Sequence, residues 1–264
     1  MKAPAFAYAK PASLPEALEL LRRPGAKALA GGQSLIPSLN MRLSQPELLV
    51  DITGLKELSG IGLFSGGLRV GALATHSQIE KSKEIRTHVP LLADAAPHIA
   101  HPAIRNRGTL GGSLALADPA AEYPACTVAL DAVFILRSLQ GERRVRASEF
   151  FKGLFETELR AGELLVAVEF PAAKPGDRFV FLELARRQGD YAIVGLAAHN
   201  ERAVLFGVGS TPFVVKDFPI KEKAKAFLKK HLDPSPDLYH SSAAKRHLAG
   251  VLLERAWSRL STSR

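Results

Sequence analysis

Two glycine-rich segments of similar design are the parts of this sequence best suited to chemistry. They are Ala30-Gly31-Gly32-Gln33-Ser34-Leu35 and Thr109-Leu110-Gly111-Gly112-Ser113-Leu114. Paired glycines adopt dihedrals closed to other residues and place no side chain over the backbone, so successive N–H groups can converge on an anion such as a diphosphate. Each segment alone is also compatible with an ordinary tight turn. Together they predict two backbone clefts that hold one dinucleotide from both sides.

Two carboxylates, Asp118 and Glu122, follow the second segment. Carboxylates accept hydrogen bonds from ribose hydroxyls, while loop amides and the hydroxyls of Ser34, Thr109 and Ser113 donate to phosphate. This combination suits an adenine dinucleotide. Neither segment fits the Gly-x-Gly-x-x-Gly fingerprint or continues as Gly-Lys-Ser/Thr, so the sequence indicates neither a Rossmann site nor a P-loop.

Short α/β elements are predicted around the first segment. Ser13 and Glu16 form a capping-box pattern that begins a helix, and apolar runs flank the glycines. The predicted elements are a helix from Ser13 to about Leu21, a strand at 26–30, a brief helix at 36–43 and a buried strand at 48–52. They would deliver the first glycine segment from the end of a strand.

From residue 58 the pattern changes to hairpins and helices. The predicted elements are strands at 61–64 and 68–71 joined by a Ser-Gly-Gly turn, a helix opened by a Thr75–Gln78 capping box, a helix at 90–99, a helix at 122–130 and a strand at 133–136. The irregular stretch 101–108 leads into the second glycine segment.

A linker-like stretch, Pro-Ala-Ala-Lys-Pro-Gly-Asp at 171–177, predicts a domain boundary. Beyond it, strands at 179–184, 191–198 and 203–208 and helices at 221–230 and 242–260 predict a small α+β module. The predicted domains are 1–173, with subdomains of about 1–56 and 57–173, and 177–264.

Composition narrows the function classes. The chain has 264 residues, 47% of them hydrophobic, a formal net charge of +9 and one cysteine, Cys126. One cysteine excludes an internal disulfide framework and an iron–sulfur cluster held by this chain alone. No stretch approaches the apolar length of a membrane span, so a cytoplasmic protein is expected. The lysines of 216–230 indicate a solvated helix face, because no nucleic-acid motif accompanies them.

The two segments and the residues around them resemble the FAD-binding medium subunit of the molybdenum hydroxylases, the family of bacterial carbon monoxide dehydrogenases and xanthine dehydrogenases. Ala-Gly-Gly-Gln-Ser-Leu and Thr-Leu-Gly-Gly-Ser-Leu with Ala-Asp-Pro-Ala-Ala-Glu carry the likeness. Further family-like stretches lie at 105–108, 186–192 and 246–249. The chain departs from the pattern at Leu116, where many relatives have histidine, and at Leu182 and Glu183, where many have a lysine nearby.

The resemblance implies an α+β fold: a vanillyl-alcohol-oxidase-type (PCMH-type) FAD domain of two α/β subdomains, followed by a small α+β domain. It implies no catalytic or metal-ligating residue in this chain. Glu122 would face the adenosine, and Leu165 and Tyr191 would pack near the isoalloxazine. The implied FAD-binding residues are Leu29, Ala30, Gly31, Gly32, Gln33, Ser34, Leu35, Thr109, Leu110, Gly111, Gly112, Ser113, Asp118, Glu122, Leu165 and Tyr191.

Several of these residues have a structural alternative. Leu165 lies in an apolar run typical of strand core, Asp118 precedes a proline and can start a turn, and Tyr191 can anchor the core of the second domain. His76 and His101 are each a lone histidine beside a loop, which is more often structural than catalytic, so neither receives a role.

Three functions follow. In the first, implied by the resemblance, FAD takes electrons from the 2Fe-2S clusters of a small subunit, in a complex whose large subunit carries molybdopterin, and passes them to an external acceptor. The second is a self-contained FAD-dependent oxidase or reductase, against which the lack of a pocket motif in 178–264 argues. The third is a basic binding module without a cofactor. Neither nucleic acid nor a membrane is expected as a partner.

Overall fold

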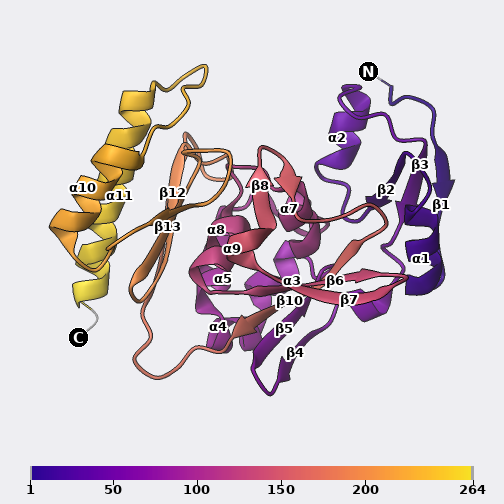
Figure 1. Cartoon of the computed structure of the whole chain (residues 1–264), viewed down its shortest axis with the longest axis horizontal. Helices are drawn as coiled ribbons and strands as arrows, with labels where there is room; N and C mark the ends of the chain where they lie inside the picture. The colour runs from indigo at the N-terminus through magenta and orange to yellow at the C-terminus, as the bar shows by residue number, and fades with distance from the viewer. Residues whose placement is uncertain (1, 263–264) are drawn as a thin grey trace.

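The computed structural model describes residues 2–262 and arranges them as an N-terminal α/β unit, a central unit and a C-terminal unit in a row (Figure 1). The central unit joins the other two. Within residues 2–262, no helix combines the length and apolar composition that crossing a membrane requires.

The N-terminal unit is a parallel sheet of strand order β1-β3-β2. Its elements are β1 (Ala7–Ala9), α1 (Leu14–Leu21), β2 (Ala26–Leu29), α2 (Leu35–Asn40), β3 (Leu48–Asp51) and the 3-10 turn η1 (Lys56–Leu58). Strand β3 is buried along its whole length, as its apolar run predicts. The carboxyl ends of β2 and β3 meet at one edge, and the first glycine segment leaves from there.

The central unit is built on an antiparallel sheet of order β4-β5-β10-β6-β7 covered by helices. Its strands are β4 (Ile61–Phe64), β5 (Gly67–Gly71), β6 (Val133–Ser138), β7 (Gly141–Arg146) and β10 (Leu164–Pro171), with β8 (Phe151–Gly153) and β9 (Glu156–Thr157) paired separately. Its helices are α3 (His76–Lys81), α4 (Lys83–His88), α5 (Pro90–Ala95), η2 (Ala96–His98), α6 (Pro102–Arg105), α7 (Leu110–Leu116), α8 (Glu122–Ala129) and α9 (Ala147–Phe150).

The C-terminal unit is an antiparallel sheet of order β11-β12-β13-β14 with helices on its outer face (Figure 1). It contains β11 (Phe179–Leu184), β12 (Val194–His199), β13 (Arg202–Phe206), β14 (Phe213–Val215), α10 (Lys221–His231) and α11 (Ser242–Thr262). The inner face packs on α5 and α8, and Phe181 and Phe206 join the apolar core of the central unit. The two units therefore share buried apolar surface, which fixes their mutual placement.

Some predicted elements are corrected by the structure. The helix expected at 90–99 ends at Ala95 and continues as a 3-10 turn over 96–98; Pro97 lies in that turn and has no N–H for an α-helical bond. The Ser13 capping box is only half formed, because the Glu16 carboxylate accepts from the Ala12 N–H instead of that of Ser13. The Thr75–Gln78 capping box is complete, as predicted.

Candidate cofactor site

The two glycine segments, far apart in the sequence, meet in space. A Cβ placed on Gly31 would lie 2.1 Å from the carbonyl oxygen of Arg107 and 2.9 Å from the Cα of Gly108. Real Cβ atoms do not approach backbone so closely, so only glycine permits this contact. Arg107 and Gly108 immediately precede the second segment, which is therefore held directly against the first.

The first segment presents a row of unused backbone donors. Within the described part of the chain, the N–H groups of 31–35 form no hydrogen bond, and the first helical bond of α2 is donated by Ile36 to Gly32. Gly32 has φ +73, a conformation that L side chains disfavour, and the side chain of Gln33 donates to the Gly31 carbonyl at 3.0 Å. Unpaired amides aimed from a glycine turn are the donors that an anion requires.

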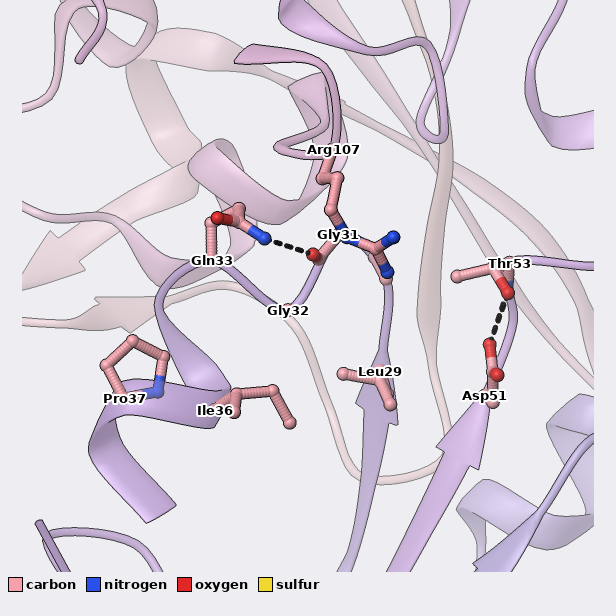
Figure 2. A pocket seen from close by; sticks show the side chains of 10 residues that line it. Leu29, Gly31, Gly32, Gln33, Ile36, Pro37, Asp51, Thr53 and Arg107 are labelled. Carbon is pink, nitrogen blue, oxygen red and sulfur yellow. Dashed lines mark hydrogen bonds between the residues drawn. The ribbon is translucent and has the colours of Figure 1, made fainter. Parts of the chain in front are cut away.

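Three of the residues that carry these donors, Gly31, Gly32 and Gln33, line a cavity of about 480 Å³ (Figure 2). It is lined by Leu29, Ala30, Gly31, Gly32, Gln33, Ile36, Pro37, Asp51, Thr53 and Arg107. Figure 2 shows the side chain of Arg107 lying across the segment beside Gly31, with Asp51 and Thr53 beyond it. Across residues 2–262 the Arg107 guanidinium has no ion pair or hydrogen bond, so it is available to an anionic ligand.

Asp51 is a buried carboxylate on the wall of this cavity. Its oxygens accept hydrogen bonds from the Tyr8 hydroxyl and from the backbone N–H and hydroxyl of Thr53, and Lys10 lies 3.9 Å away. Burial alone would raise the pKa of Asp51, but the bonds from Thr53 and Tyr8 outweigh it and the pKa is lowered. An ionised acceptor therefore faces the cavity, suited to a hydroxyl group of a ligand.

The second segment was predicted to be a loop, and that prediction is wrong. The segment is the first turn of helix α7, with Thr109 as its N-cap. Its amides are already bonded: Leu110 donates to the Ala74 carbonyl at 2.9 Å, Gly111 to Ala72 at 2.8 Å and Gly112 to the Thr109 hydroxyl at 3.1 Å. The amides of 110–112 therefore do not face a ligand. What this segment can offer is the proton of the Thr109 hydroxyl and the Ser113 side chain.

The glycines of α7 have a packing reason. A Cβ on Gly111 would lie 2.5 Å from the Cβ of Ala72, and one on Gly112 would lie 2.8 Å from the Thr109 hydroxyl. Gly111 thus lets the helix approach the end of β5, and Gly112 leaves room for its capping hydroxyl.

Asp118 lies in the turn before helix α8, Glu122 is the first residue of that helix, and Tyr191 lies in the loop between β11 and β12. The Asp118 carboxylate accepts from the Ala120 N–H at 2.9 Å, so the turn predicted from Pro119 is confirmed. Partial desolvation, and then the charges of Asp118 and Glu122, raise the pKa of Tyr191.

Tyr191 and Leu165 differ sharply in exposure. Tyr191 is 73% exposed, so the alternative that it anchors the core of the C-terminal unit is wrong, and its ring is free to contact a ligand. Leu165 is 2% exposed within β10 and belongs to the central apolar core. It therefore has the strand-core position that its apolar run offered as an alternative to a place beside the flavin. A β-bulge follows it, and there the Val166 carbonyl accepts from the Ala72 N–H.

Glu122 is expected to make stability depend on pH. Burial, and then the charge of Asp118, raise its pKa to about 7. Below pH 4.5, the pKa of Glu122 in the unfolded chain, the carboxyl is protonated in both the folded and the unfolded state. Above that pH the unfolded chain loses the proton first, so the free energy of unfolding falls as pH rises. The fall ends near pH 7, where Glu122 ionises in the folded protein as well.

Removing this carboxyl should therefore reduce the pH dependence. We expect the difference in free energy of unfolding between Glu122→Gln and the unsubstituted protein to grow in favour of the variant, by up to roughly 3 kcal/mol, as pH rises from about 5 to about 7.5. Urea unfolding of the FAD-free chain across this range checks it. Glu149→Gln, on exposed α9 surface, is the control. Parallel curves for Glu122→Gln and the unsubstituted chain would contradict the pKa assignment.

Comparison with known proteins agrees with this geometry. The family model of the FAD binding domain in molybdopterin dehydrogenase matches residues 4–173. The 6-hydroxypseudooxynicotine dehydrogenase complex subunit alpha of Paenarthrobacter nicotinovorans is 39% identical over 279 residues, which cover 97% of this chain and 94% of the relative. The chain belongs to the FAD-binding medium subunits of the molybdenum hydroxylase family. It is thus an FAD-binding subunit of an oxidoreductase, and the cofactor-free binding module is excluded.

Solved structures of this family have the same fold. Carbon monoxide dehydrogenase from Hydrogenophaga pseudoflava superposes with a TM-score of 0.94 at 32% identity, over 99% of each chain. Quinoline 2-oxidoreductase from Pseudomonas putida 86 gives a TM-score of 0.92 at 37% identity, over 100% of this chain and 99% of that one. The α+β fold implied by the resemblance is therefore confirmed.

The residues present fit the FAD of this family. Among the unpaired amides of 31–35, those of Gly31, Gly32 and Gln33 belong to residues that line one cavity with the unpaired guanidinium of Arg107, which supplies donors for a diphosphate. Arg107, Asp51 and Thr53 were missed at the sequence level. Asp51 carried a signal: it ends a strand parallel to the one that delivers the glycines, and carboxyl ends of parallel strands share an edge. Arg107 lies in the family-like stretch 105–108, but nothing in that stretch indicated its place beside the first glycine segment.

Proposed function

We propose that this chain is the electron-transfer subunit of a multi-subunit molybdenum hydroxylase. In this proposal it takes electrons from the 2Fe-2S clusters of a small subunit, beside a molybdopterin-containing large subunit, and passes them to an external acceptor. The observation that carries the proposal is the near-complete match to a dehydrogenase complex subunit and to the medium chain of carbon monoxide dehydrogenase from Hydrogenophaga pseudoflava, which is 34% identical over 97% of this chain and 98% of that one.

The chain's own share is to bind and orient FAD. When bound, FAD supplies the redox chemistry, and the protein sets its position and its electrostatic surroundings. We assign the amides of 31–35, the guanidinium of Arg107 and the hydroxyl of Thr109 to the diphosphate, and Asp51 to a hydroxyl group of the cofactor. Glu122, with Asp118 in the turn before it, would face the adenosine, and Tyr191 would border the isoalloxazine. Leu29 and Ala30 would line the site, Ser113 would offer its hydroxyl, and Leu110, Gly111, Gly112 and Leu165 would support it through packing. The division into domains 1–173 and 177–264 belongs to the same proposal.

Copurification tests the assembly. The chain is tagged in its native cell, isolated without denaturant, and analysed for flavin, iron and molybdenum. We expect one FAD for each copy of the chain, together with two further kinds of polypeptide and both metals. A homogeneous yellow chain that oxidises a substrate with no partner would instead establish the self-contained oxidase or reductase. A cytoplasmic location stays a prediction.

Arg107→Gln is expected to weaken FAD binding. A charge-assisted hydrogen bond contributes about 1.5–3 kcal/mol, so the dissociation constant should rise about 10- to 100-fold. The salt dependence of binding should fall as well, because one cation is lost from the site.

Titration of the flavin-depleted chain with FAD, followed by flavin fluorescence at two salt concentrations, measures both effects. Arg137→Gln is the matched control, since Arg137 pairs with Glu142 on the β6–β7 hairpin, away from the cavity, and its loss changes the net charge equally. Equal weakening by both variants would show a general charge effect and remove Arg107 from the site.

A further inference from the structure

A turn in the central unit supports a loop of the C-terminal unit. A Cβ on Gly189 would lie 2.7 Å from the carbonyl oxygen of Ala100 and 3.0 Å from Cε1 of His101, so the glycine backbone rests directly on the turn. Gly189 has φ +84 and Ala100 has φ +44. Left-handed backbone is unfavourable for alanine, so the turn needs other contacts to hold it in this conformation.

Arg105 supplies those contacts. Its Nη1 donates to the carbonyl oxygens of Pro97 at 3.4 Å, Ile99 at 3.1 Å and Ala100 at 2.9 Å, and its Nε donates to the Glu80 carboxylate at 2.9 Å. The side chain is only 11% exposed. A planar guanidinium can bond carboxylate and carbonyls at once in a fixed geometry, which a lysine ammonium cannot reproduce.

The same turn also contacts strand β11. The ring of His98 lies 5.0 Å from that of Phe181, and its Nδ1 lies 3.7 Å from the Glu183 carboxylate. The turn at 96–101 therefore contacts the C-terminal unit both at β11 and at the loop 186–191. Arg105 stabilises this turn through its hydrogen bonds to the turn's carbonyl groups.

We propose that Arg105 is a positioning residue for the 186–191 loop and, through it, for Tyr191. The path is short: Arg105 fixes the carbonyl of Ala100, Gly189 rests on that carbonyl, and Tyr191 follows two residues later. Arg105 itself contacts no proposed cofactor group. The proposal rests on the proposed function in one respect only, that the exposed Tyr191 ring borders the flavin.

Limited proteolysis of the full chain tests the placement without FAD. Arg186 and Arg187 are exposed in this loop, and trypsin cleaves after arginine once the loop opens. We expect Arg105→Lys to accelerate cleavage at this loop about tenfold, since cleavage follows the open population. Arg143→Lys is the matched control: Arg143 also bonds a carboxylate, Glu163, and a carbonyl, that of Glu158, but on β7, and it should leave this cleavage unchanged.

Gly189→Ala disrupts the contact between the 186–191 loop and the Ala100 carbonyl from the side of the loop. It should accelerate the same cleavage, and the Arg105→Lys/Gly189→Ala double variant should be cleaved no faster than the faster single variant, because both remove one contact. If Arg105→Lys does not fold, Glu80→Ala takes its place, because it removes the carboxylate that holds the Arg105 side chain. Unchanged cleavage in the folded variants, or equal acceleration by Arg143→Lys, would overturn the proposal.

A flavin readout separates this inference from the proposed function. In Arg105→Lys we expect FAD to bind at the usual stoichiometry, since the first glycine segment and Arg107 are intact, while the flavin fluorescence and midpoint potential change. Arg143→Lys should alter neither. Accelerated cleavage in a chain that binds no FAD at all would retain the loop placement and refute the proposed function. Unaltered flavin properties beside accelerated cleavage would refute the link to Tyr191.

Discussion

Gly31→Ala is expected to abolish stoichiometric FAD binding. The added Cβ would lie 2.1 Å from the Arg107 carbonyl oxygen, a backbone atom that cannot rotate away, so the two glycine segments must separate. Overpacking of this kind costs about 1–3 kcal/mol or more. Because about 1.4 kcal/mol changes affinity tenfold, we expect FAD affinity to fall by roughly a hundredfold or more.

The ratio of flavin to protein after gel filtration, and the dissociation constant from fluorescence titration, measure this loss. Gly62→Ala is the control: Gly62 lies in strand β4, and a Cβ there meets nothing within 4 Å. This variant should retain FAD fully. If Gly31→Ala retains one FAD per chain, the contact between the two segments is not part of the site.

Gly32→Val is expected to lose FAD for a different reason. Gly32 has φ +73, which costs a non-glycine residue about 1–2 kcal/mol and a β-branched residue more. Its Cβ would lie 3.2 Å from Cγ1 of Ile36, and the valine methyl groups would enter the cavity onto which the unpaired amides open. Strain and obstruction act on the same turn, so affinity should fall at least as far as in Gly31→Ala.

Gly176→Val is the control that separates backbone strain at a glycine of positive φ from obstruction of the cavity. Gly176 also has positive φ, +90, but an added Cβ meets nothing within 4 Å, and its loop lies outside the cavity. The variant should lose thermal stability and still bind FAD at the ordinary stoichiometry. Equal loss of FAD in both valine variants would attribute the effect to unfolding, and the role of Gly32 in the site would be withdrawn.

Local signals predicted much of the fold. The strands at 26–29 and 48–51 and the helix after Ser13 follow from capping residues and apolar runs, which act within a few residues. Strand β7 was missed because three arginines interrupt its pattern. Two of them, Arg143 and Arg144, pair with Glu163 and Glu169, and those partners come from distant parts of the chain.

The site was predicted less completely than the fold. Gly111 and Gly112 weaken helix propensity, so the second segment resembled a loop, whereas close approach to Ala72 requires a small residue in that helix. The contact of Gly31 with Arg107 brings together residues whose sequence neighbourhoods give no hint of each other. Long-range packing of this kind decides which amides remain free, and no local pattern records it.

The most direct test is a crystal structure of this chain with FAD bound. We expect diphosphate oxygens within about 3.2 Å of amide nitrogens in 31–35 and of the Arg107 guanidinium, with the amides of 110–112 still bonded inside the protein. A diphosphate held away from 31–35, or bound by amides of 110–112 released from their present partners, would contradict the account.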